Sequence, residues 1–237
     1  MKKFVVSVDL GQLNDYTAIT ILEEVIVRRP NPTIHDLLIG NEGEVEFERH
    51  YHLRHIDRPP LRTPYTDQIK LVKDVVDSPA LQNNCELVID VTGVGRPIFD
   101  MMRLAGLKPI PITITNGKSI TMDEDGGYHV PKRDLAMSLQ AIFGSRRVKV
   151  ASGMPLAPVF LREMETFAIK VTKAGNDSYE AWREQEHDDI VMSVAMGVWW
   201  VLYSRASRVH LDRIREEEKR EEYDPRAYLD SNDGRGR

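Results

Sequence analysis

The stretch from Phe4 to Val27, FVVSVDLGQLNDYTAITILEEVIV, contains two hydrophobic segments separated by a short polar turn. β-Branched residues dominate the first segment, Phe4–Leu10, which predicts a buried strand ending at Asp9. The second segment, Thr17–Val27, partly alternates in hydrophobicity, and the GQLNDY between the two is typical of a turn. The stretch therefore predicts an antiparallel hairpin with Asp9 at the end of a core strand.

The rest of the chain predicts an α/β domain around this hairpin. Further strands are expected at residues 44–53, 87–91, 109–115 and 148–150, and the prolines of 109–115 favour a sheet edge. Helices are expected around 69–76 and at 97–105, 130–143 and 156–167, with a long one from His187. Residues 168–172 could pair with 178–182, and 28–43 and 116–128 are expected to be loops. Strands first, then βα units and a terminal helix, predict a mixed sheet flanked by helices.

Composition limits the class of protein. The 237 residues correspond to one large domain, or one domain with a small appendage, and 41% of them are hydrophobic. The single cysteine, Cys85, excludes an internal disulfide framework and a cysteine-based zinc site and fits a reducing cytosol. The net charge of -5 argues against a protein that coats nucleic acid nonspecifically. No run approaches the ~18 apolar residues that a membrane span needs, and Asp9 interrupts the apolar start, which favours a strand over a signal peptide.

The composition changes at Arg205. Residues 205–237 contain nine basic and nine acidic side chains and few large apolar ones. We therefore expect a folded domain at 1–204 and a charged C-terminal extension at 205–237, whose last ten residues are disordered.

Acidic residues occupy three comparable places in the predicted domain. Asp9 ends the first strand, Asp90 ends a central strand, and Asp188 and Asp189 open the long helix. The carboxyl ends of strands line the ligand crevice of α/β sheets, so these carboxylates can converge. Converging carboxylates repel one another unless a cation neutralises them, and their oxygens suit Mg²⁺ or Mn²⁺. Two such ions, ~3.5–4 Å apart, would activate a water and stabilise the leaving oxygen of a phosphodiester.

Each of these residues has a simpler explanation when it is considered alone. An aspartate at a strand end is more often a turn former, and one that opens a helix is usually a cap. Asp15, in the polar turn, fits ordinary turn chemistry. The joint placement of Asp9 and Asp90 inside apolar segments favours the shared site.

Other motifs are weaker. The segment DVTGVGRP at 90–97 suits any tight strand–helix turn, although it could cradle a phosphate, and Gly117-Lys118-Ser119 lacks the glycine of a Walker A motif. His187 could tune a metal-bound water but more often caps a helix, and His50, His52 and His55 resemble an alternating strand face. Basic residues that could contact phosphates are Arg96, Lys132, Arg133, Arg146, Arg147, Lys149, Lys170 and Lys173.

Four segments in order resemble the nuclease domain of the terminase large subunit of tailed bacteriophages. They are VVSVDLGQLNDYTAI, LVIDVTGVGRPIFDMM, YHVPKRDLAMSLQAIF and HDDIVMSVAMGVWW, and the resemblance covers residues 1 to about 203. It implies a ribonuclease H-like fold and a metal-dependent endodeoxyribonuclease. Such an enzyme cuts double-stranded viral DNA concatemers during genome packaging, with little sequence preference and with two Mg²⁺ or Mn²⁺ ions.

The resemblance also assigns roles to residues. Asp9, Asp90 and Asp189 match the catalytic metal ligands, Asp188 matches a supporting ligand or cap, and Asp15 matches an accessory acid. One departure is Met192, where family members often have a further aspartate.

The partners that the resemblance implies are DNA, a terminase ATPase domain or chain, a small terminase subunit and a portal, in the cytoplasm of a bacterial host and without a membrane. Full terminases carry an N-terminal ATPase, which implies either an excised domain or a separate ATPase chain.

Three alternatives remain open at this stage. A Holliday-junction resolvase shares the fold and would prefer branched DNA. The actin-like phosphotransferases have a similar first hairpin, but they need duplicated domains and give the helix-opening HDD no role. A non-enzymatic docking module would keep the fold with a degenerate site.

Overall fold

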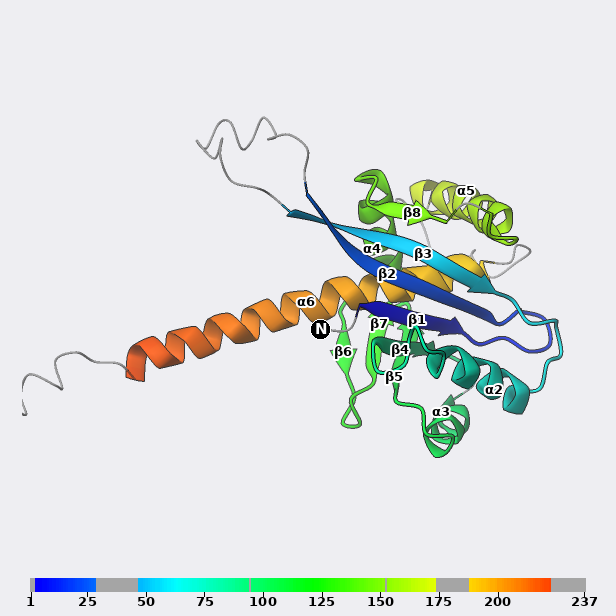
Figure 1. Ribbon diagram of the computed structural model, residues 1–237, viewed down its shortest axis with the longest axis horizontal. Helices are drawn as coiled ribbons and strands as arrows, with labels where there is room; N and C mark the ends of the chain where they lie inside the picture. Colours follow the sequence, from blue (N-terminus) through cyan, green and yellow to red (C-terminus); the bar gives the residue numbers. More distant parts are fainter. Residues whose placement is uncertain (1–2, 29–46, 94, 152, 174–187, 223–237) are drawn as a thin grey trace, which may run out of the picture. The chain divides into compact units, whose positions relative to one another are not determined.

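The computed structural model describes residues 3–28, 47–93, 95–151, 153–173 and 188–222, which form one eight-stranded sheet with helices on both faces (Figure 1). The strands are β1 (Phe4–Asp9), β2 (Ala18–Arg28), β3 (Phe47–Asp57), β4 (Cys85–Asp90), β5 (Pro109–Thr115), β6 (Thr121–Met122), β7 (Tyr128–Pro131) and β8 (Val148–Val150). The helices are α2 (Tyr65–Val76), α3 (Gly95–Leu104), α4 (Lys132–Gly144), α5 (Ala157–Lys173) and α6 (Asp189–Glu222).

The hairpin predicted at the start of the chain forms the centre of the sheet. β1 pairs antiparallel with β2, in a register that sets Asp9 opposite Ala18, and β4 lies parallel to β1 on its other side. The strand order is β6-β7-β5-β4-β1-β2-β3-β8, and every strand except β2 and β6 runs in the direction of β1. The expected α/β class, a mixed sheet flanked by helices, is confirmed.

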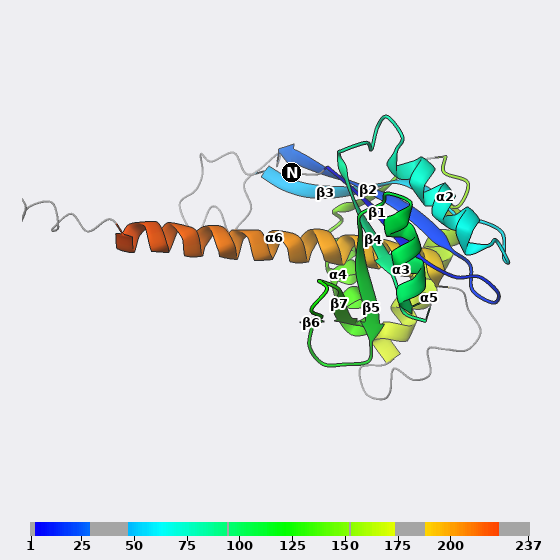
Figure 2. The same cartoon turned by 90° about the horizontal axis from the view of Figure 1, so that it is seen from below.

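The two faces of the sheet have different coverings. Side chains alternate between faces along a strand, so Val6 and Val8 project from β1 to one side and Ser7 projects to the other. Val6 and Val8 join a buried cluster with Ile69 and Val72 of α2, and Figure 2 shows α2 and α3 together on this face. The opposite face of β1 is covered by the first part of α6.

α6 approaches the sheet closely at Ser193 and Gly197, two positions with small side chains. The Ser193 hydroxyl donates to the Ser7 carbonyl oxygen at 2.9 Å and lies 2.8 Å from the Thr20 hydroxyl. One turn further on, a Cβ at Gly197 would lie 2.3 Å from the Ser7 Oγ and 2.9 Å from the Leu22 Cδ1. The hydrophobic run of this helix is therefore buried, as its sequence from Ile190 to Val201 predicts.

Five sequence predictions are corrected. The expected loop 116–128 contains β6, and residues 130–131, expected to open a helix, end β7. β3 extends to Asp57 instead of ending at residue 53, because its pairing with β2 continues to Ile19. β5 lies inside the sheet, between β4 and β7, because its prolines precede Ile112, where the pairing with β7 begins. Residues 168–172 belong to α5, not to a strand. Their expected partner, 178–182, and His187 lie outside the described residues.

The chain divides into two compact units, residues 1–200 and 201–237, and α6 contributes its first residues to one and the rest to the other. The boundary at 204 and the disordered end stay predictions. In the part of the chain that the structure describes, no helix is both long and apolar enough to cross a membrane.

The close approach of α6 makes Gly197 a sensitive position. Gly197→Ala forces the helix away from Ser7 and Leu22, because the new Cβ would overlap both side chains. We expect the free energy of unfolding in urea to fall by about 1–3 kcal/mol. Gly144→Ala is the matched control, since a Cβ there meets nothing within 4 Å. Equal effects of the two substitutions would contradict this account of the packing.

Candidate active site

Asp9 and Asp90 end two adjacent parallel strands on the same face of the sheet. The register pairs Val8 with Ile89, so the next step along both strands sets Asp9 beside Asp90. Neighbouring strands lie ~4.8 Å apart. By the alternation of side chains, Asp9 shares the face of Ser7, and that face is covered by α6. The strand ends thus direct both carboxylates toward the start of α6.

The start of α6 adds two more carboxylates to this place. Asp189 is the first residue of the helix and is 5% exposed, while Asp188 precedes it. The charges of both residues act on Asp9, together with that of Asp90. The four aspartates that the sequence analysis singled out on strand ends and a helix start are therefore neighbours in the fold.

Burial and mutual repulsion make these carboxylates hard to ionise. Burial raises the pKa of Asp9 well above its usual value, and the charges of Asp90, Asp189 and Asp188 raise it further. Burial likewise raises the pKa of Asp90 from 3.8 to about 6, although hydrogen bonds from Thr92 oppose the shift. One of these bonds runs from the Thr92 amide to the Asp90 Oδ1 at 2.7 Å.

Lys132 supplies a positive charge to the cluster. It is the first residue of α4, which begins directly after β7, and its Nζ lies 3.3 Å from the Asp188 Oδ2. Its charge lowers the pKa values of both Asp9 and Asp90, against the larger effect of burial. Lys132 was predicted to contact phosphate, and the structure places it beside the aspartates.

Arg58 supplies a second positive charge, next to Asp189. It follows the end of β3, and its Nη2 donates to the Asp189 Oδ2 at 3.0 Å. Its Nη1 lies 3.5 Å from the Glu163 Oε1 on α5. The guanidinium also lies over the ring of Tyr16, 3.9 Å from its centroid. Arg58 thus joins the β1–β2 loop, β3, α5 and α6 at the edge of the aspartate cluster.

Glu163 caps α6 from a different helix. Its Oε2 accepts hydrogen bonds from the amides of Ile190, at 3.0 Å, and Val191, at 3.2 Å. These amides belong to the first turn of α6, where helical partners are missing and an N-cap side chain usually accepts. The cap therefore comes from Glu163, and the Asp188 carboxylate faces Lys132 instead. Burial raises the pKa of Glu163 to about 7, although the bond from the Val191 amide and the charge of Arg58 oppose the shift.

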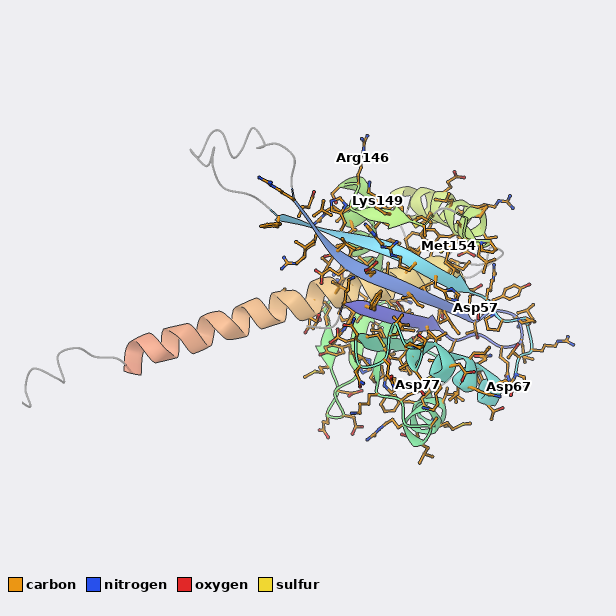
Figure 3. The ribbon with its side chains drawn as sticks, in the orientation of Figure 1. Asp57, Asp67, Asp77, Arg146, Lys149 and Met154 are labelled. Atoms are coloured by element: carbon orange, nitrogen blue, oxygen red, sulfur yellow. The ribbon has the colours of Figure 1, made fainter. Side chains whose placement is uncertain are left out.

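Other predicted site residues lie apart from the cluster or outside the described residues. Asp15 is exposed in the β1–β2 loop and is not among the charges that act on Asp9. Met192, at the departure from the family pattern, is buried. Figure 3 shows Arg146 and Lys149 around β8, well separated from Asp57 at the end of β3. His187 and the side chains of Arg96, Lys170 and Lys173 lie outside the described part of the chain.

The chemistry of the donor set fits a divalent cation, because it consists of carboxylates that repel one another. The described side chains, as they lie, contain no group of three or more His, Cys, Asp or Glu residues placed to hold an ion. Asp188 and Asp189 are instead engaged by Lys132 and Arg58. Lys132 and Arg58 thus act as counter-ions of Asp188 and Asp189.

Sequence analysis missed Arg58 and Glu163. Arg58 lies beyond the strand as it was predicted, so no element placed it at the site. Glu163, by contrast, carries a readable signal: it lies between Phe160 and Phe167 at helical spacing, and all three are buried. A charged residue on an apolar helix face indicates a buried partner.

Comparisons with known proteins find a likeness of fold among solved structures. No protein-family model matches the chain, and no curated protein sequence matches it. Among solved structures, the chain is similar to "Crystal structure of the large terminase nuclease from thermophilic phage G20c". The identity is 18%, the match covers 83% of this chain and 81% of that chain, and the TM-score is 0.47. The likeness concerns the fold alone.

The raised pKa of Asp90 predicts a pH-dependent stability. The folded state holds the Asp90 proton up to about pH 6, whereas the unfolded chain releases it near 3.8. The unfolded state therefore binds fewer protons between these values, and stability falls as the pH rises through this window. In EDTA, we expect Asp90→Asn to gain up to about 3 kcal/mol relative to wild type between pH 4 and pH 7. Parallel stability curves would contradict the shift, and Asp77→Asn is the surface control.

Because Glu163 caps α6, we expect the alanine substitutions of Asp188 and Glu163 to lower the free energy of unfolding by different amounts. Asp188→Ala leaves the α6 cap intact and removes a like charge near Asp9, so the free energy of unfolding stays within about 0.5 kcal/mol of wild type. Glu163→Ala leaves two amides and the Nη1 of Arg58 without an acceptor, which costs about 2 kcal/mol or more. Urea unfolding of both variants checks this order, and the reverse order would identify Asp188 as the cap.

Proposed function

We propose that this protein is a metal-dependent endonuclease that cuts double-stranded DNA with little sequence preference. Asp9, Asp90 and Asp189 are its catalytic metal ligands, and Asp188 is a supporting one. Asp15 is proposed as an accessory acid that would reach the ions only from the exposed β1–β2 loop. The observation that carries the proposal is the convergence of Asp9 and Asp90, at adjacent strand ends, with Asp188 and Asp189 at the start of α6, where the other three acids each raise the pKa of Asp9. Such clusters cost stability, and strongly perturbed groups of this kind gather at functional sites.

The donor set favours Mg²⁺ or Mn²⁺ as the bound ions. Carboxylate oxygens are hard ligands that suit both metals. When bound, a pair of such ions supplies activation of a water molecule and stabilisation of the leaving oxygen of a phosphodiester.

The chain's own residues prepare the site. The sheet hydrogen bonds of β1 and β4 fix the backbone of Asp9 and Asp90, and the Thr92 amide orients the Asp90 carboxylate. Lys132 favours the ionised form of both acids, the form that a metal ligand needs. Lys132 also places an ammonium at the site that can approach a phosphate group of DNA.

The biological setting follows from the sequence resemblance. We propose that the nuclease cuts viral DNA concatemers during genome packaging, in the cytoplasm of a bacterial host. Its partners would be a terminase ATPase domain or chain, a small terminase subunit and a portal, with the extension at 205–237 available for such contacts.

Cleavage of supercoiled plasmid tests the proposal directly. Wild type is incubated with Mg²⁺, Mn²⁺ or EDTA beside Asp9→Asn and Asp90→Asn. We expect nicking and linearisation that require metal and fall by about 100-fold or more in both variants, because each substitution removes a ligand charge.

Two further variants and one further substrate sharpen the result. Asp77→Asn, at an exposed position that pairs with Lys73, should cut as wild type does, and Asp15→Asn measures the contribution of the accessory acid. A preference for four-way junctions over plasmid would favour a resolvase instead. Metal-independent cutting, or full activity in Asp90→Asn, would contradict the assignment of these aspartates as catalytic metal ligands.

A further inference from the structure

Arg58 occupies a nearly closed position between two buried acids. The exposed fraction of its side chain is 13%, and those of Glu163 and Asp189 are 7% each. One terminal nitrogen of the guanidinium faces each carboxylate, and the plane of the group lies over the Tyr16 ring. Its Nε is buried and has no hydrogen-bond partner. The group is therefore held by two acids and a ring face, and its orientation is determined by all three.

Asp189 depends on such support more than the strand-borne acids do. The backbone of Asp9 and of Asp90 is fixed by ladder hydrogen bonds within the sheet. Asp189 instead begins a helix, where the first amides lack helical acceptors. Glu163 accepts from the two amides that follow it, at 3.0 and 3.2 Å, and so holds the turn that carries Asp189.

From this geometry we propose that Arg58 and Glu163 are positioning residues of the aspartate site. Glu163 fixes the first turn of α6 and the far side of Arg58, and Arg58 sets the direction of the Asp189 carboxylate. The inference rests on the proposed function, since it assigns to both residues an effect on metal binding through Asp189. Residues that orient a ligating carboxylate in this way commonly change metal affinity by about 10–100-fold when they are altered.

Positioning can be separated from simple charge balance at Arg58. A lysine keeps the positive charge, but its ammonium is not planar. It cannot bind both carboxylates as the guanidinium does, nor can it stack on the Tyr16 ring. If Arg58 acted only as a counter-ion, Arg58→Lys would preserve the site. If it orients Asp189, the same variant must weaken metal binding although the net charge is unchanged.

The test is calorimetric titration of the full chain with Mn²⁺ alone, without DNA. We expect Arg58→Lys to bind Mn²⁺ about 10-fold more weakly than wild type. Glu163→Gln should weaken binding similarly, because it keeps the side-chain volume and one acceptor oxygen for α6 but puts an NH2 group in place of the oxygen that faces Arg58. The two variants change the two partners of the Arg58–Glu163 contact. If only one of them folds, that variant is sufficient for the test. All are compared well below their unfolding temperatures.

Arg49→Lys is the matched control. Arg49 lies on β3, the strand that Arg58 follows, and pairs with Glu24 at 3.0 Å, but it is nine residues before Arg58, roughly 30 Å along an extended chain. Its Mn²⁺ affinity should equal that of wild type. If Arg58→Lys binds Mn²⁺ within about twofold of wild type, the positioning role is overturned while the nuclease proposal stands. If wild type itself binds no Mn²⁺, the proposed function falls and this inference falls with it.

Discussion

Repulsion among the carboxylates of Asp9, Asp90, Asp188 and Asp189 is the constraint around which this end of the molecule is built. Burial and the other three acids all raise the pKa of Asp9, so the cluster opposes folding whenever its members ionise. A fold selected for stability alone would place such residues apart or pair each with a partner. The divalent cations of the proposed function would supply the positive charge that Asp9 and Asp90 lack.

The surrounding structure offsets part of this repulsion with positive charges and fixes the positions of the acids. Lys132 reaches the cluster because α4 starts directly at the end of β7, and Arg58 reaches it because β3 runs to Asp57. Glu163 accepts the cap hydrogen bonds of α6, which leaves Asp188 to face Lys132. Because Gly197 has no side chain, the same helix can lie close to Ser7 of the sheet. Helix capping, close packing and charge balance therefore all determine where the start of α6 lies.

The elements with strong local patterns were predictable. The hairpin from Phe4 to Val27 follows from β-branched runs around a polar turn, and the long hydrophobic run after Asp189 is the buried helix that it predicts. β5 was misplaced at an edge because its prolines lack N–H donors, and the sequence does not show that β7 pairs only with the later part of the strand. Residues 168–172 were assigned to a strand because a short apolar run has no period of its own, whereas α5 continues through them.

The sequence by itself determined which acids end strands and open the last helix, because strand length, alternation and helix start are local properties. It thereby identified Asp9, Asp90, Asp188 and Asp189 as candidates for one site. Only the tertiary structure decided what surrounds them. Arg58 and Glu163 come from elements separated from Asp189 by 131 and by about 26 residues, and no local pattern relates such positions. Their contacts depend on how far β3 extends and how α5 packs beside α6, which are consequences of the assembled sheet and its covering helices.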